Sequence, residues 1–410
     1  MTLFNGGAAR PAERRDPSGG LPPGKAGRVA PVPFSQFVLK VASRCNLACD
    51  YCYVYEMADQ SWRRQPAVMP VDILAQTARR IGEHARTHQL SSVRVILHGG
   101  EPLLAGAAWL GEALTTLRAE IPAGVTPQFV VQTNGLLLDE RMLTVLREHR
   151  VQVGVSLDGP AAAHDRHRVT GAGRASHARV AAALERLTAP PHRELFAGLL
   201  CVVDLVNEPV SVYEELLRYS PPQIDFLLPH GTWAAPPPGR LPDDPATPYA
   251  DWLIAVFDRW YRAARRPNVR LFSEIIHLLF GGHSATEAVG LTPVSVLVVE
   301  SDGTLEQADA LKVAYDGAAV TGLSVMTGPL DLALRHPAIL ARQAGIEGIA
   351  AECRACEVRD VCGGGFYPHR YRADTGFDNP SVYCLDLLTL IRHIRDSIAG
   401  EVALLPRRRR

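Results

Sequence analysis

The sequence predicts an α/β fold in which a parallel sheet curls into a partial or full barrel with helices outside it. Six short apolar runs alternate with six amphipathic segments over residues 34–265. Runs that are apolar throughout suit strands covered on both faces, and strand–helix alternation produces parallel strands with right-handed crossovers. Polar motifs follow several of these runs, so we expect a functional site at the carboxyl ends of the strands.

The strands are expected at 34–43, 92–99, 127–135, 151–159, 195–204 and 223–231. The helices between them are expected at 71–90, 107–119, 139–149, 175–188, 209–219 and 249–265. In the first helix, apolar residues recur on one face, which is typical of a helix packed on a sheet. A hairpin is expected later in the chain, in VLVVESDGTLEQADAL at 296–311.

Composition favours neither a nucleic acid nor a membrane as a partner. Lys plus Arg and Asp plus Glu are 43 each, so no net charge attracts a polyanion or an anionic surface. The sequence has neither an apolar run long enough to span a bilayer nor the apolar core of a signal peptide. We therefore expect a cytoplasmic protein, in which clustered cysteines indicate metal binding or catalysis before disulfides.

The eight cysteines fall into three groups, of which the first comes directly after the first strand. Cys201 stands alone in an apolar run and is expected to be a buried free cysteine. Cys45, Cys49 and Cys52 form the motif CNLACDYC. Three thiolates at this spacing suit three irons of a [4Fe–4S] cluster and leave the fourth iron free. A structural zinc site would need a fourth ligand, which nothing nearby supplies.

The stretch CNLACDYCY, with Tyr51 at its aromatic position, resembles the cluster motif of radical S-adenosylmethionine (SAM) enzymes. The later stretch LHGGEPLL resembles the GGEP segment of the same family. The resemblance implies a partial (β/α)6 barrel and a SAM molecule that chelates the free iron. Reductive cleavage of SAM would then yield a 5′-deoxyadenosyl radical that abstracts hydrogen from an unactivated carbon.

The resemblance also implies which residues contact SAM. Gly99 and Gly100 would let the backbone approach the methionine moiety, and Glu101 would accept from its ammonium group. Ser156 and Asp158 would contact the ribose hydroxyls. The alternative for Asp158 is that it only forms an ordinary turn. The implied contacts are Tyr51, Tyr53, Gly99, Gly100, Glu101, Ser156, Asp158 and Arg168. Tyr53 would contact the adenine of SAM, and the alternative is that its ring only packs in the core. Arg168 would bind the SAM carboxylate, and the alternative is that it only forms a surface salt bridge.

The third cysteine group lies near the C-terminus, in CRACEVRDVC and at Cys384. Its members are Cys353, Cys356, Cys362 and Cys384. Four such thiolates could close a zinc site or a fully ligated [4Fe–4S] cluster. The stretch CRACEVRDVCGGGFYPHRY resembles the SPASM extension of radical SAM peptide maturases, which implies an auxiliary [4Fe–4S] cluster here. Phe366 replaces a cysteine of the usual pattern and the 296–311 hairpin has none, so a second auxiliary cluster is expected to be lost.

The expected organisation has four parts. Residues 1–33 form a flexible tail, because they hold too few apolar side chains to offset the entropy lost on ordering. Residues 34–285 form the barrel, and residues 286–400 form a SPASM-like domain with one auxiliary cluster. Residues 401–410, which end in RRRR, form a basic tail.

Asp309 is the candidate catalytic base. It follows the DG turn of the hairpin, where SPASM maturases place Cys-Asp and this chain has Ala308-Asp309. The resemblance implies that this carboxylate takes a proton from the substrate. The alternative is that Asp309 only orients the substrate or caps a turn.

The stretches FVLKVASRCNLACDYCYVYEMADQSWRRQP and DGTLEQADALKVAYDG resemble the Fxs-type branch of the three-residue cyclophane-forming maturases. The resemblance implies a ribosomal precursor peptide as substrate and a new bond between an aromatic ring and a Cβ. It also implies an external electron donor such as a flavodoxin or a ferredoxin. Thioether formation, formylglycine formation and epimerisation remain open, as does a non-catalytic iron–sulfur or zinc scaffold.

Overall fold

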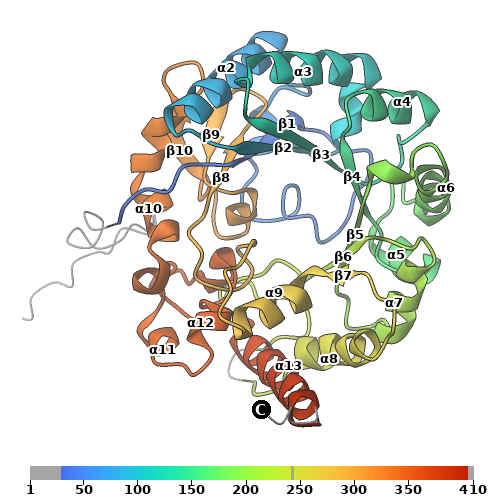
Figure 1. Ribbon diagram of the computed structural model, residues 1–410, viewed down its shortest axis with the longest axis vertical. Coiled ribbons are helices and arrows are strands. Elements are labelled where there is room, and N and C mark those ends of the chain that lie inside the picture. The colour runs from blue at the N-terminus through green and yellow to red at the C-terminus, as the bar shows by residue number, and fades with distance from the viewer. Residues whose placement is uncertain (1–28, 242–243, 405–410) are drawn as a thin grey trace, which may run out of the picture.

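The computed structural model describes residues 29–241 and 244–404 (Figure 1). Most of the expected N-terminal tail and the end of the basic tail lie outside the described residues. The described strands form one sheet in the order β10-β9-β8-β1-β2-β3-β4-β5-β6-β7. Figure 1 shows this sheet curving with helices along its outer side, so the predicted partial barrel is confirmed.

All six predicted strands are present and run parallel to their neighbours. They are β1 (Gln36–Ala42), β2 (Ser92–Gly99), β3 (Thr126–Thr133), β4 (Gln152–Ser156), β5 (Phe196–Val202) and β6 (Gln223–Leu227). β4 and β6 end earlier than expected. β4 stops at Ser156 because the chain turns at Gly159, whose φ of 91° favours glycine.

The six predicted helices are also confirmed, with small shifts at their ends. They are α2 (Val71–Thr87), α3 (Ala107–Glu120), α4 (Glu140–Glu148), α6 (His177–Thr188), α7 (Pro209–Leu217) and α8 (Pro248–Tyr261). The other described helices are α5 (Ala161–His167), α9 (Arg270–Leu279), α10 (Pro337–Gln343), α11 (Ala351–Arg354), α12 (Arg359–Cys362) and α13 (Cys384–Leu404). None of the helices within the described ranges has the length and apolar character needed to cross a membrane.

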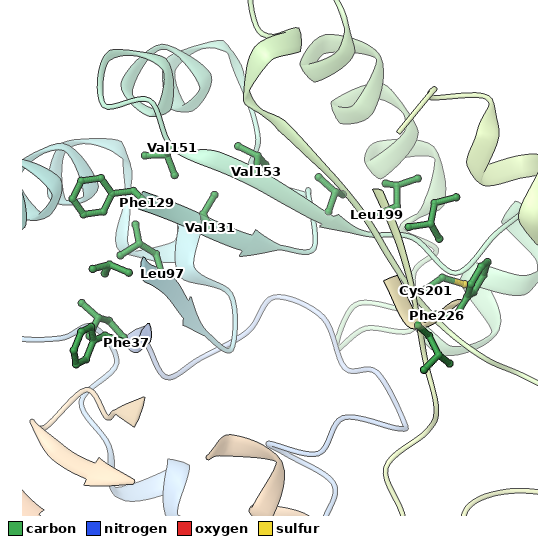
Figure 2. Close-up of a cluster of buried hydrophobic side chains, with 14 of the residues drawn as sticks. Phe37, Leu97, Phe129, Val131, Val151, Val153, Leu199, Cys201 and Phe226 are labelled. Atoms are coloured by element: carbon green, nitrogen blue, oxygen red, sulfur yellow. The ribbon is translucent and has the colours of Figure 1, made fainter. Parts of the chain in front are cut away.

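Strand alternation gives the sheet an apolar outer face. In β1, Phe37, Leu39 and Val41 have no exposed surface and belong to one core cluster with the α2 side chains Leu74 and Ile81. Figure 2 shows Phe37, Leu97, Phe129 and Val131 on successive strands of this face. Burying each such side chain contributes about 2 kcal/mol, so this layer is the main stabilising element of the barrel.

The predicted hairpin is present, but it belongs to the barrel sheet. β8 (Val296–Val299) pairs parallel with β1, and β9 (Thr304–Glu306) and β10 (Val320–Ser324) follow as antiparallel strands. A two-residue strand, β7 (Asn268–Val269), forms the other edge. The expected boundary at 285/286 is therefore crossed by direct strand pairing, and the division into domains stays a prediction.

Candidate active site

The first cysteine group lies in the loop between β1 and α2, where its thiols come close together. Cys45, Cys49 and Cys52 are free and half-buried. The Leu47 backbone N–H lies 3.4 Å from Cys45 Sγ, and Asn134 Nδ2 lies 3.7 Å from the same atom. N–H groups aimed at sulfur stabilise a thiolate, so this donor set fits an iron–sulfur cluster.

The electrostatics of these thiols also fit a cationic cluster. Burial raises the pKa of Cys45 to about 11 and the pKa of Cys49 to about 12. The neighbouring thiols add to both shifts, whereas the Arg168 guanidinium acts in the opposite direction on Cys49. Three thiolates this close need a bound cation to stay ionised, which is what a metal cluster provides.

Gly99 and Gly100 are required by close packing of the backbone. A Cβ on Gly99 would lie 1.9 Å from the Ala42 carbonyl oxygen, and one on Gly100 would lie 2.5 Å from that of Arg44. The Gly100 N–H donates to the Ala42 carbonyl at 2.8 Å. The glycine pair thus holds the end of β2 against the start of the cysteine loop, and its approach to SAM stays a prediction.

Glu101 has no exposed surface, and its carboxylate is already occupied by protein donors. Oε1 accepts from the Leu103 N–H at 3.0 Å and from Thr133 Oγ1 at 2.7 Å, and Oε2 accepts from the Asn134 N–H at 2.8 Å. Burial outweighs these bonds and raises the pKa of Glu101 to about 7. The structure gives Glu101 the role of joining the ends of β2 and β3, and the predicted ammonium contact is not tested.

Asp158, Arg168 and Tyr51 form a buried group beside Cys49. Arg168 Nε donates to Asp158 Oδ2 at 2.7 Å, the Tyr51 hydroxyl donates to the same oxygen, and the Val202 N–H donates to Oδ1 at 3.0 Å. Burial would raise the pKa of Asp158, but Arg168 outweighs it and the pKa is lowered. Asp158 is therefore used to anchor Arg168 and Tyr51, which competes with its expected ribose contact.

Ser156 and Tyr53 are the remaining predicted SAM contacts. Ser156, at the end of β4, accepts from Gln132 Nε2 at 3.3 Å. The Tyr53 hydroxyl lies 3.4 Å from Asp309 Oδ2, and its ring packs edge-on against His230 at 4.8 Å. Tyr53 thus lies beside the candidate base as well as next to Cys52, and both predicted contacts stay predictions.

Asp309 pairs with Lys40 of β1 across 2.6 Å, and the Lys40 side chain is 2% exposed. His98 Nδ1 lies 3.5 Å from Asp309 Oδ2. Among the described residues, neither His98 Nδ1 nor Asp309 Oδ1 has a hydrogen-bond partner. Burial would raise the pKa of Asp309, but Lys40 and Lys312 outweigh it and hold the pKa well below its ordinary value. Asp309 is therefore a fixed carboxylate whose second oxygen is available.

Three further ionisable side chains extend this group. Lys312 Nζ lies 2.5 Å from Glu300 and 3.1 Å from Glu306. Burial raises the pKa of Glu306 well above its ordinary value, and the Glu300 charge adds to this shift. The shift favours the protonated form of Glu306, and the carboxyl groups of Glu300 and Asp309 each lie beside a lysine, Lys312 and Lys40 respectively.

The C-terminal cysteines converge on a second site. Cys353, Cys356, Cys362 and Cys384 are free thiols that line one cavity of about 100 Å³. They come from α11, α12, the loop between them and the first residue of α13. Burial raises the pKa of Cys362 to about 12, and nearby Arg370 acts in the opposite direction. Four convergent thiols fit a fully ligated metal site, although the identity of the metal stays a prediction.

A larger cavity, of about 530 Å³, runs inside the sheet from its amino-terminal edge toward these sites. One end is lined by Gln36, Arg94 and Gln128, and another part by His230, Phe366 and His369. His230 Nδ1 lies 3.3 Å from His369 Nε2, and burial lowers the pKa of His230 to about 4. The neutral histidines and Phe366 form an aromatic wall that contacts Tyr53 through His230.

Sequence reasoning assigned several of these residues no role in the site. Lys40 and His98 occupy paired register positions on β1 and β2, and alternation places both on the inner face. A lysine and a histidine on the inner face of apolar strands are the signal that could have drawn attention to them. His230 and Phe366 are 136 residues apart in the chain, and no sequence pattern brings them together.

Comparison with known proteins agrees with this geometry. The family description "Radical SAM superfamily" matches residues 39–189, which contain the first cysteine group, Gly99 to Glu101 and Arg168. The protein is a radical SAM enzyme. The radical SAM domain implies SAM and a [4Fe–4S] cluster as cofactors, which the three thiols after β1 fit.

The radical SAM enzyme has relatives that align along most of its length. It is 27% identical over 355 residues to the serine-type anaerobic sulfatase-maturating enzyme of Klebsiella aerogenes, covering 83% of this chain and 81% of the relative. It is 26% identical over 289 residues to the cysteine-type enzyme of Clostridium perfringens, covering 68% and 74%.

Solved structures show the same fold. Native anSMEcpe with bound AdoMet and Cp18Cys peptide matches with a TM-score of 0.76 and 21% identity, covering 92% of this radical SAM enzyme and 100% of that chain. Streptococcus suis SuiB bound to its precursor peptide SuiA matches with a TM-score of 0.56 and 13% identity, covering 88% and 77%. These likenesses establish a radical SAM barrel with a C-terminal extension.

Proposed function

We propose that this radical SAM enzyme oxidises a ribosomally made precursor peptide and joins an aromatic ring to the Cβ of a residue two positions away. The main support for a peptide substrate is the alignment with sulfatase-maturating enzymes over 83% of the chain, because this alignment extends beyond the radical SAM domain. Two structural relatives were solved with peptides bound, which supports the same substrate class. The crosslink rests on the resemblance to the cyclophane-forming branch.

The cavity supports an extended peptide as the ligand. Its volume of about 530 Å³ suits several residues rather than a whole domain. Its aromatic wall, formed by His230, Phe366 and His369, would hold an aromatic side chain by edge and face contacts. Tyr53 links this wall to Asp309 and to the loop that carries Cys52, so a ring held there would lie close to the radical site.

The reaction is balanced as a two-electron oxidation. The bound SAM and its cluster would supply a radical that removes one hydrogen atom from Cβ, and the four-cysteine site would hold a second cluster able to accept an electron. The Cβ radical would add to the ring, which must then lose one electron and one proton. Asp309 Oδ1 would take the proton, and Lys40 would hold that carboxylate in place. The predicted SAM contacts would orient the donor.

Formylglycine formation is the second candidate, because the relatives named above are sulfatase-maturating enzymes. That oxidation needs a base strong enough to act on a hydroxyl or thiol. Asp309 is a weak base here, because Lys40 and Lys312 hold its pKa below the ordinary value. A ring that has already lost its electron is a strong acid, so a weak carboxylate suffices for the crosslink.

The test is to express the enzyme with small peptides encoded beside its gene and to sequence the products by tandem mass spectrometry. A crosslink predicts the loss of two hydrogens and no fragmentation between the joined residues. An aldehyde from serine gives the same mass loss but reacts with a hydrazide reagent. Reduced enzyme should also release 5′-deoxyadenosine from SAM, and failure to do so would contradict both candidates.

A further inference from the structure

The inner face of the first three strands is arranged in layers. Gln36, Arg94 and Gln128 are register partners on β1, β2 and β3 and form a polar row at the amino-terminal edge. Two residues further along each strand, Val38, Ile96 and Val130 form an aliphatic row. Lys40 and His98 follow at the far end, beside Asp309. A ligand that follows these strands would meet a polar, an apolar and a charged layer in turn.

Arg94 is the unbalanced charge of the polar row. Its Nε and Nη2 donate to Gln128 Oε1 at 3.3 and 3.2 Å, and no carboxylate in the described part of the chain lies within ion-pair distance. The other charged residues that line the cavity have partners. Asp225 pairs with Arg270, and Glu287 accepts from Arg342 at 2.5 Å. The cavity therefore presents a free guanidinium at this edge, although its charged side chains sum to zero.

The spacing between Arg94 and the reaction site follows from strand geometry. Arg94 and His98 are four residues apart on β2 and point to the same face. At about 3.3 Å per residue, the two positions are about 13 Å apart along the strand. An extended peptide lying along the inner face covers this distance with about four residues.

We propose that Arg94 binds a carboxylate of the substrate peptide, about four residues from the residue that is modified. This inference rests on the proposed function and adds a specificity determinant to it. Guanidinium groups bind carboxylates through paired N–H donors, and the Gln128 oxygen already fixes the orientation of the Arg94 side chain. The carboxylate would belong either to an Asp or Glu side chain or to the C-terminus of the peptide.

The test uses fluorescein-labelled peptides of glycine, serine and alanine that contain one phenylalanine. Each carries one Asp two, four or seven residues before or after the phenylalanine, has an amidated C-terminus and is matched by an Asn version. One further peptide ends in a free carboxylate four residues after the phenylalanine, with the amide as its control. Fluorescence anisotropy with the reconstituted full-length enzyme gives the dissociation constants.

We expect the carboxylate at four residues, on one side of the phenylalanine, to tighten binding about three- to tenfold over the neutral control. Arg94→Ala should abolish this difference, Arg94→Lys should retain part of it, and 0.5 M salt should weaken it. The control Arg141→Ala changes an exposed arginine on α4, away from the cavity, and should leave the difference intact. Equal iron content and circular dichroism would establish that the variants are folded.

Three results would overturn the inference. They are equal affinities for the charged and neutral peptides, an equal loss for both in Arg94→Ala, and no binding of any peptide. The proposed function is judged separately, by the mass of the enzymatic product. If the enzyme forms a crosslinked product from a substrate that the wild type and Arg94→Ala bind equally well, only this inference is rejected. If binding depends on the carboxylate but the peptide is not oxidised, only the proposed reaction is rejected.

Discussion

Lys40 and Asp309 connect the first strand of the barrel to the hairpin that follows it by more than 250 residues in the chain. Their 2.6 Å contact is buried, so the electrostatic attraction between the two charges is stronger than in an exposed ion pair. The same pair fixes the carboxylate that we propose as a proton acceptor. Positioning and stability therefore depend on one interaction.

Breaking this pair from one side should destabilise the enzyme. In Lys40→Met the Asp309 charge would stay buried with Lys312 as its remaining cation, and we expect the free energy of unfolding to fall by about 3 kcal/mol. Urea unfolding of the anaerobically reconstituted protein measures this change in the free energy of unfolding. The double variant Lys40→Met with Asp309→Asn removes both charges and should recover most of the loss. A single variant as stable as the wild type would contradict the pairing.

His164 is a buried histidine whose hydrogen bonds specify a neutral ring. Nδ1 accepts from the Asp158 N–H at 3.3 Å, and Nε2 faces Ser176 Oγ at 3.0 Å. The Ser176 hydroxyl donates to the Arg168 carbonyl, so His164 must donate from Nε2. A second proton on Nδ1 would face the Asp158 N–H. Burial and the Arg168 charge accordingly lower the pKa of His164 to about 4.

This histidine should make stability depend on pH. As the pH falls below about 6.5 the unfolded chain takes up a proton at His164, whereas the folded protein does so only near pH 4. Stability is therefore lost as the pH falls, by about 2 kcal/mol between pH 7 and pH 5 from this residue. In His164→Gln, which keeps one acceptor and one donor, that loss should shrink, as measured by urea unfolding at both pH values. An unchanged difference would contradict a neutral His164.

At the scale of elements, the end of β2 shows how backbone packing shapes the site. Gly99 pairs with Ala42 in the sheet, and the two backbones approach too closely for a side chain on Gly99. Cys45, the first member of the first cysteine group, lies three residues after Ala42. Any displacement there would move the thiols relative to Asn134 and Arg168.

Gly99→Ala should therefore be strongly destabilising. Its Cβ would lie 1.9 Å from a backbone oxygen that cannot move without breaking the β1–β2 pairing, and we expect a loss of about 3 kcal/mol or more. Gly171→Ala is the matched control, because a Cβ at Gly171 would meet nothing within 4 Å. Thermal unfolding of both variants measures the contrast. Equal midpoints would show that the close approach is absent.

The hairpin of β8 and β9 also shows how the packing of elements shapes the fold. It was expected in a separate C-terminal domain, yet β8 extends the barrel sheet beside β1. Its apolar run Val296–Val299 is what a strand covered on both faces requires, so the composition is consistent with this position. Nothing in the run specifies which strand it joins.

For the molecule as a whole, the two cysteine sites define a barrel centre and a C-terminal centre. The cavity of about 530 Å³ is lined in part by His230, which contacts Tyr53 beside the first cysteine group, and by Phe366, which belongs to the C-terminal segment. An electron that leaves a substrate ring in this cavity would pass toward the four-cysteine site, since Phe366 lies four residues after Cys362. In the proposed reaction, this arrangement would compensate for the predicted loss of the other auxiliary cluster.

Iron content tests this arrangement. Cys384→Ser should lose about half of the iron of the reconstituted enzyme, because one of two predicted four-iron clusters would lack a ligand. The variant should still cleave SAM after reduction but should form no peptide product. Cys201→Ser is the control, since Cys201 is buried on the outer face near Phe226 (Figure 2) and should affect neither readout. Full iron content in Cys384→Ser, or zinc in the wild type, would contradict the prediction.

Local patterns were sufficient for the positions of the six strands β1 to β6 and for the grouping of Cys45, Cys49 and Cys52, because periodicity and short spacings act between neighbouring residues. Only the tertiary structure decided the pairing of β8 with β1, the contact of Lys40 with Asp309 and the use of Asp158 and Glu101 as internal anchors. It also decided that Arg94 has no counter-ion within residues 29–241 and 244–404. These features depend on which surfaces meet when distant segments pack, and burial then sets the charge state of each group.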